Sequence, residues 1–188
     1  MLDIDCDVVA GGWDAAFDWE ELAATAIRAA LAGDGRRRAL EEDGLVELSV
    51  RLTDDDEVRR LNRDYRDRDR PTNILSFPML AADEVDAALE PRTADLLLGD
   101  LALAYETTAR EAEDKAIPLA DHVAHLLVHG TLHLLGHDHQ DDPSADAMEA
   151  LEVRILATLG IADPYRDAAV IGIADPCRDT AAAKAAHR

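Results

Sequence analysis

The residues best suited to chemistry lie between positions 129 and 139, where four histidines fall within eleven residues. His129 and His133 are four apart, so on a helix their side chains lie on one face, about 5–6 Å apart at Cβ. Gly136 is suited to a left-handed turn that ends this helix, because it has no Cβ. Such a turn would bring His139 back toward the same point. The spacing therefore predicts that these three imidazoles bind one metal ion.

Three neutral imidazoles, with a fourth position left for water, are typical of a catalytic zinc site rather than a structural one. An ion held in this way makes a water nucleophile available near neutral pH. We expect one Zn2+ per chain, although nickel also suits imidazole ligands. The alternative is that the histidines lie on a solvated helix surface. His137 is ambiguous, since its neighbour Asp138 could orient a ligand imidazole or simply face water.

The same spacing of histidines and glycine occurs in the metzincin proteases, which carry a glutamate directly after the first histidine as general base. Gly130 takes that place here, and it can neither accept nor hold a proton. The sequence therefore disfavours a zinc peptidase of that type and favours a different hydrolysis.

Three blocks of the sequence resemble one known family. The stretch His129-Gly-Thr-Leu-His-Leu-Leu-Gly-His-Asp-His139 resembles the signature of the YbeY family of metal-dependent endoribonucleases, which cut single-stranded RNA in ribosomal RNA processing. Residues 61–78, with Pro71-Thr-Asn-Ile-Leu-Ser-Phe-Pro78, and residues 98–101, Leu-Gly-Asp-Leu, resemble two further blocks. The resemblance extends over roughly residues 2–165.

The resemblance also implies roles for single residues. By it, His129, His133 and His139 are the metal ligands, and Arg66 is the arginine that the family uses in catalysis. An arginine suits that task, because its planar fork can clamp two phosphodiester oxygens and stabilise charge that grows in the transition state. His137 stands where many members carry tyrosine, which argues against its being a ligand.

The overall charge conflicts with an RNA substrate. The chain carries a formal net charge of −21, which should repel a polyanion at long range. Six arginines between positions 59 and 70 face three aspartates, so this window has a local charge of +3. For every arginine except Arg66, contact with RNA and pairing with neighbouring aspartates on a solvated helix are equally good interpretations.

The hydrophobic pattern predicts an α/β fold of the mixed α+β kind. Alternation at 2–9 and 45–52 indicates half-buried strands, and apolar runs at 74–77 and 96–103 indicate buried ones. Helical spacing is found at 18–33, 53–66, 106–113, 118–135 and 145–159. Residues 79–93 have no clear period and are expected to form a surface loop. The resemblance implies a small four-stranded mixed sheet, packed with about five helices, and the metal site lies at the end of a buried helix.

Several polar residues have two interpretations. The acids of residues 54–57, after a capping Thr53, favour a helix start over a magnesium site. His122 and His125 lie on the stripe of the metal ligands and are expected in the core or behind the ligands. Asp100 interrupts an apolar run, so we expect it to orient a partner near the site. The general base is open between the metal's own water, Asp138 and Asp100.

The length of 188 residues suits one domain. We expect an endoribonuclease domain at 1–165 and an extension at 166–188, in which residues 160–169 recur from 172 onward. This Ala-rich extension is expected to be disordered. The acidic start has no basic leader, and Cys6 and Cys177 are the only cysteines, which favours a reducing cytoplasm. The longest apolar runs are too short to cross a membrane.

The function predicted from these features is single-strand-specific, zinc-dependent endoribonuclease activity. It would serve ribosomal RNA processing, including maturation of the small-subunit 3′ end, and ribosome quality control. The expected partners are single-stranded and ribosomal RNA and the ribosome with its associated proteins, with no part for DNA or a membrane. Two alternatives come from other classes: a non-catalytic ribosome-assembly factor with a structural metal, and a zinc peptidase or amidohydrolase.

Overall fold

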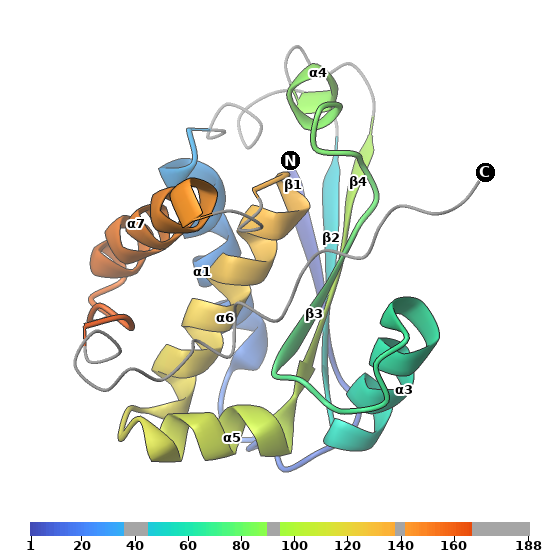
Figure 1. Ribbon diagram of the computed structural model, residues 1–188, viewed down its shortest axis with the longest axis vertical. Coiled ribbons are helices and arrows are strands. Elements are labelled where there is room, and N and C mark those ends of the chain that lie inside the picture. Colours follow the sequence, from blue (N-terminus) through green and yellow to red (C-terminus); the bar gives the residue numbers. More distant parts are fainter. Residues whose placement is uncertain (36–44, 90–94, 138–141, 167–188) are drawn as a thin grey trace.

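The computed structural model describes residues 1–35, 45–89, 95–137 and 142–166 (Figure 1). Its centre is a four-stranded sheet in the order β1-β2-β4-β3. The strands are β1 (Leu2–Val8), β2 (Val46–Thr53), β3 (Ile74–Pro78) and β4 (Leu96–Ala104). The first three in the sheet are parallel, and β3 runs antiparallel to β4 at the edge. The predicted mixed four-stranded sheet is confirmed.

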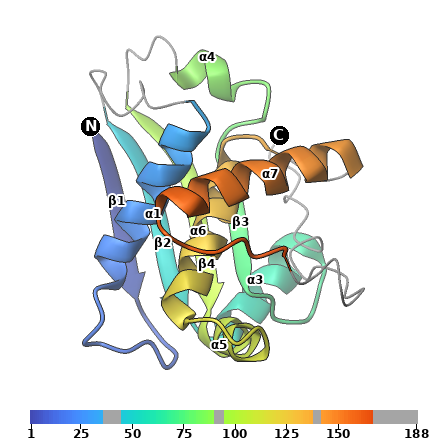
Figure 2. The same ribbon diagram turned by 90° about the vertical axis from the view of Figure 1, so that its left-hand side faces the viewer.

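The helices divide between the two faces of this sheet (Figures 1 and 2). One face is covered by α1 (Trp19–Gly33), α6 (Leu119–Leu134) and α7 (Asp142–Thr158), and the other by α3 (Asp55–Arg66). The helix α5 (Tyr105–Asp114) follows β4 directly, and the short α4 (Val85–Leu89) lies where a loop was expected. Val85 is fully buried, which anchors that turn. In the described ranges, no helix is long and apolar enough to cross a membrane.

The helix α6 is held very close to the sheet at Gly130. A Cβ at this position would lie 2.8 Å from Ile74 Cδ1 and 2.8 Å from Leu101 Cδ2, which is closer than packed atoms approach. The residue that follows the first metal-site histidine therefore faces the sheet. A larger side chain in its place would have to displace the terminal methyl groups of Ile74 and Leu101. Every residue of α6 from His122 to Leu134 is buried.

The end of α6 has the predicted turn. Gly136 has a φ of +87°, in the left-handed region that glycine adopts at little cost. The amide of His137 donates to the carbonyl of Leu132 over 3.0 Å, so the turn satisfies a carbonyl of the last helical turn. The helix therefore ends in a glycine turn three residues after His133.

The expectation that Asp100 is buried near the site is wrong. A shift of register opposite Glu47 and Leu48 turns β4, and Gly99, with a φ of +144°, lies against the carbonyl of Phe77. Leu101 faces α6, so Asp100 points to the opposite face of the sheet, and it is exposed there. The helix α3 covers that face only around Leu75 and Ala104.

The acids at the start of α3 bind backbone amides. Asp54, not the expected Thr53, is the N-cap, and its Oδ1 accepts a hydrogen bond from the amide of Glu57 at 2.9 Å. Asp55 Oδ1 accepts from the amide of Thr107 at 3.0 Å, which ties α3 to α5. These bonds agree with the helix-start interpretation of the acidic run. They also fix the helix that ends at Arg66.

Replacing Asp54 with alanine is expected to lower the free energy of unfolding by about 1 kcal/mol, because the cap bond to Glu57 is lost. Asp56→Ala is the matched control, since Asp56 lies in the same helical turn but is exposed. The Asp56→Ala variant is expected to lose less than about 0.5 kcal/mol in the free energy of unfolding. Urea unfolding of both variants measures the difference, and equal losses would show that the cap contributes nothing beyond charge.

Candidate metal centre and arginine cavity

The rings of His129 and His133 converge at their Nε2 atoms. These two nitrogens lie 3.1 Å apart, and both side chains are 3% exposed. Two ligand nitrogens at 2.0–2.1 Å from one tetrahedral ion would be about 3.3 Å apart. The observed pair therefore fits one divalent ion. His139, the predicted third ligand, lies outside the described residues, and within those ranges no set of three or more His, Cys, Asp or Glu side chains is placed to bind a metal.

The opposite nitrogen of each ring has its own acceptor. His129 Nδ1 donates to Glu152 Oε1 over 2.9 Å, and His133 Nδ1 donates to the carbonyl of His137 over 2.9 Å. A neutral imidazole with its proton on Nδ1 presents a lone pair at Nε2. Each ring is thus fixed in the tautomer and orientation that a metal ligand needs. His137 contributes through its backbone, while its own Nε2 bonds to Asp34 at the end of α1.

Glu152 on α7 accepts hydrogen bonds from His129 and from two further side chains. Its Oε2 accepts hydrogen bonds from His125 Nε2, at 3.0 Å, and from the hydroxyl of Tyr165. The carboxylate is 1% exposed, and burial alone would raise its pKa. The interactions with His129 and His125 outweigh burial and hold the pKa of Glu152 well below its usual range. The buried carboxylate is therefore ionised and paired.

The sequence analysis did not identify Glu152. A signal for it exists, because the glutamate lies four residues after Met148 and three before Ile155, on the apolar stripe of α7. An acid on a core-facing stripe needs a buried partner. A buried helix with several histidines elsewhere in the chain offers that partner.

A second carboxylate, Glu111 on α5, binds the first histidine of the stripe. Its Oε2 accepts from His122 Nε2 at 2.8 Å and from Asn73 Nδ2 at 3.0 Å. His122 is fully buried, and burial lowers its pKa, so the ring is neutral at pH 7. The side chain of Glu111 is only 16% exposed. His122 and His125 both bind carboxylates, as expected for histidines behind a metal site.

Arg66 ends α3 and turns its guanidinium toward β3. Nη2 donates to the carbonyl of Ser76 over 3.2 Å, and Nε is buried without a hydrogen-bond partner among the described residues. Burial, helped by the neighbouring Arg68, lowers the pKa of Arg66 to about 10, so the group stays charged at neutral pH. Ser76 lies beside Gly130, the neighbour of His129 in sequence. Arg66 is thereby placed next to the helix of the metal-site histidines.

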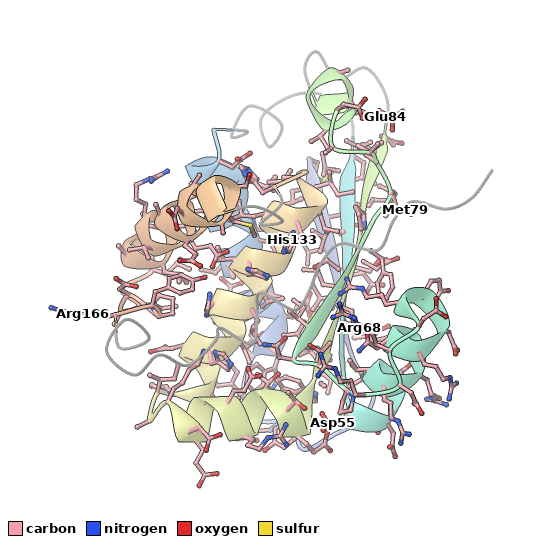
Figure 3. All side chains as sticks on the ribbon, viewed as in Figure 1. Asp55, Arg68, Met79, Glu84, His133 and Arg166 are labelled. Carbon is pink, nitrogen blue, oxygen red and sulfur yellow. The ribbon has the colours of Figure 1, made fainter. Side chains whose placement is uncertain are left out.

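Arg66 lines a cavity of about 150 Å³, here called the arginine cavity. It lies between the end of α3, the loop before β3 and α5, and Figure 3 shows Arg68 beside β3 on the side of α3. Its lining includes Arg66, Arg68, Arg70, Asn62, Thr107 and Glu111. The arginine cavity is cationic in a chain that is otherwise strongly acidic.

Two other arginines of this window follow the second interpretation. Arg59 forms a two-pronged ion pair with Asp69, at 2.8 and 3.0 Å, and Arg63 pairs with Asp64 at 2.9 Å, all on the exposed surface. Exposed pairs of this kind contribute little to stability. The window therefore holds two surface ion pairs and the three arginines of the cavity, while Arg60 is exposed and lies outside the cavity lining.

Comparison with known proteins agrees with these features. A family model described as Endoribonuclease YbeY matches residues 14–160. Endoribonuclease YbeY of Sphingopyxis alaskensis is 52% identical over 167 residues, which are 89% of this chain and 99% of that protein. The protein of the same name from Zymomonas mobilis is 44% identical over 167 residues, 89% of this chain and 94% of its own.

A solved structure supports the fold. The solution structure of TM1509 from Thermotoga maritima matches with a TM-score of 0.51 and 18% identity, over 84% of this chain and 92% of that one. Fold and matches together define an enzyme class, the endoribonucleases, which cut RNA internally. The chain belongs to the YbeY family, which is metal-dependent. The predicted resemblance is confirmed, and the substrate is RNA rather than a peptide.

Replacing Glu152 with glutamine is expected to weaken zinc binding by about 10- to 100-fold, because an uncharged amide is a weaker acceptor for His129 Nδ1–H and its NH2 group cannot accept from His125 and Tyr165. Competition against a chromophoric chelator measures the dissociation constant. Asp146→Asn, on an exposed position of α7, removes the same charge and should leave it unchanged. Unaltered zinc affinity in the Glu152 variant would mean that Glu152 does not orient His129.

Proposed function

We propose that the protein is a single-strand-specific, zinc-dependent endoribonuclease that acts in ribosomal RNA maturation, including the small-subunit 3′ end, and in ribosome quality control. The observation that carries the zinc dependence is the convergence of His129 and His133 Nε2, each ring fixed from behind. Family membership and the family's role in ribosomal RNA processing support the biological setting. Binding to the ribosome and its proteins follows from that setting.

His129, His133 and His139 would hold the metal ion. When bound, the ion supplies a Lewis acid and an activated water nucleophile. The protein's contribution is rigidity, since α6 is buried on all sides and its glycine lies against the sheet. The three-imidazole donor set suits zinc, and nickel remains the alternative.

Arg66 would bind the phosphodiester that is cut. Its guanidinium is partly desolvated and held by the carbonyl of Ser76, so little reorganisation is needed when charge develops on the phosphate oxygens. Asp100 faces away from α6, which leaves Asp138 as the carboxylate candidate for proton transfer from the attacking water. Asp138 itself lies outside the described residues.

The division into a catalytic domain at 1–165 and a repeat-derived extension at 166–188 also belongs to this proposal. The family model ends at residue 160, before the second copy of the repeat begins. Residues 167–188 lie outside the described part of the chain. A cytoplasmic location is proposed from the two distant cysteines.

Replacing His133 with alanine is expected to abolish both zinc retention and cleavage of a labelled single-stranded RNA. Elemental analysis of the purified protein, run beside the cleavage assay, measures the two together and distinguishes zinc from nickel. Chelation of the unmodified enzyme should stop cleavage, and added zinc should restore it. Full cleavage by a zinc-free His133 variant would remove the metal from the mechanism.

Replacing Arg66 with alanine should leave the zinc content intact and reduce RNA cleavage by at least about 100-fold, the scale for losing one electrostatic stabiliser. Arg60→Ala serves as control, because Arg60 is an exposed arginine of the same helix and lies outside the cavity lining. Single-turnover cleavage rates of zinc-loaded proteins make the comparison. Near-normal cleavage by the Arg66 variant would exclude this residue from catalysis.

A further inference from the structure

The arginine cavity combines two kinds of charge. Arg66, Arg68 and Arg70 supply cations, whereas Glu111 supplies one carboxylate. A ligand that satisfies both needs an anionic part for the arginines and a neutral hydrogen-bond donor for the carboxylate. A second anion beside Glu111 would be repelled.

Glu111 has one carboxylate oxygen that can accept a hydrogen bond from a ligand. His122 and Asn73 both donate to its Oε2, which leaves Oε1 as the oxygen available to a ligand. Burial would raise the pKa of Glu111, but the hydrogen bonds from His122 and Asn73 outweigh it and keep the pKa below its usual value. The carboxylate is therefore ionised at neutral pH and held in one orientation.

The size of the cavity limits the ligand. A partly open cavity of about 150 Å³ is comparable in volume to one that holds benzene, so it can take up a phosphate and the 2′-hydroxyl edge of the adjacent ribose while the base stays outside. The RNA backbone offers both required groups next to each other, as a phosphate and a 2′-hydroxyl. DNA has the phosphate and lacks the hydroxyl.

The cavity is linked to the metal-site histidines by one helix. His122, at Glu111, lies seven residues before His129, a distance of about 10 Å along α6. The rings between them form a continuous stripe, with centroids 6.0 Å apart from His122 to His125 and 6.5 Å apart from His125 to His129. A stacked strand covers about 10 Å in about three nucleotides. The cavity therefore lies where nucleotides that flank the cut bond would pass.

We infer that the arginine cavity is the site at which this enzyme distinguishes RNA from DNA. Arg68 and Arg70 bind a phosphate that flanks the cut bond, and Glu111 accepts a hydrogen bond from the adjacent 2′-hydroxyl. The inference rests on the proposed function, in which water is the nucleophile. Because the 2′-hydroxyl then takes no part in bond cleavage, preference for RNA arises in binding, and the 2′-hydroxyl is the group that RNA has and DNA lacks.

The test measures binding of the full chain, with a chelator present so that no cleavage occurs, to fluorescent single-stranded RNA and DNA of one sequence. Wild-type protein should bind RNA more tightly, and a 2′-deoxy or 2′-fluoro substitution at one position should weaken RNA binding about 10-fold or more. Fluorine accepts weakly and cannot donate, so the 2′-fluoro oligonucleotide tests donation to a carboxylate. In Glu111→Gln, the same substitutions should have no effect.

Two controls separate recognition from charge and from misfolding. Asp114→Asn removes one exposed acid from α5 and should leave the RNA preference unchanged. Arg68→Ala and Arg70→Ala should weaken RNA and DNA binding alike and reduce the salt dependence of binding by about one ion each. The comparison of modified with unmodified RNA is made within each variant, so partial unfolding lowers both affinities and cancels.

An undiminished 2′-deoxy penalty in Glu111→Gln would overturn the inference, and so would equal affinity of wild-type protein for RNA and DNA. Neither result affects the proposed function. That function is tested separately, by RNA cleavage with the zinc-loaded protein and by the loss of cleavage in His133→Ala. Absence of RNA cleavage by the zinc-loaded wild type would instead refute the proposed function, whatever the binding data show.

Discussion

Buried histidines on α6 need a partner for the ring N–H group, because an unpaired polar group in the core costs about 1–3 kcal/mol. Each histidine of the stripe receives one from elsewhere in the fold. His122 binds Glu111 of α5, His125 and His129 share Glu152 of α7, and His133 binds a carbonyl beyond its own helix. The contacts that satisfy the core are thus the contacts that aim the candidate ligands. Stability and site geometry depend on one network.

Because β3 is an edge strand, residues from helices on opposite faces of the sheet can both contact it. The helix α3 packs on the face opposite α6, yet its last residue, Arg66, reaches the carbonyl of Ser76 on β3. Ser76 in turn lies beside Gly130 of α6. An interior strand would have kept the arginine and the histidines apart. At the edge, only one strand separates them.

Local patterns in the sequence were sufficient for much of this architecture. Alternation in β2 predicted its buried Val46, Leu48, Val50 and Leu52, and Gly136 predicted the turn after α6. The predicted spacing of His129 and His133 also corresponds to converging ring nitrogens. The sheet order has no such local signal. His139 lies outside the described residues, so its role as third ligand stays a prediction.

The sequence patterns did not predict which hydrogen-bond partners the histidines of α6 would receive from distant helices. Glu111 and Glu152 are ordinary helix acids by composition, and only packing shows that each meets a histidine. Asp100 was misplaced because the irregularity near Gly99 changes which residues of β4 face α6. Tyr65 lies in the same helix as Arg66 but is 65% exposed, and its ring makes an edge-to-face contact with Phe77. Such features depend on three-dimensional context that periodicity does not contain.

The surface ion pairs of α3 have an effect on how a polyanion reaches this enzyme. Arg59 and Arg63 are neutralised by aspartates, so the cationic field is concentrated at the cavity, within a molecule of net charge −21. Within the screening distance of about 8 Å at physiological ionic strength, the acidic majority of the surface repels an approaching strand, and at larger separations the strand feels little of either charge. Attraction begins only when the strand already lies against the edge of the sheet. Added salt therefore has opposing effects, easing the encounter while it loosens the final contact.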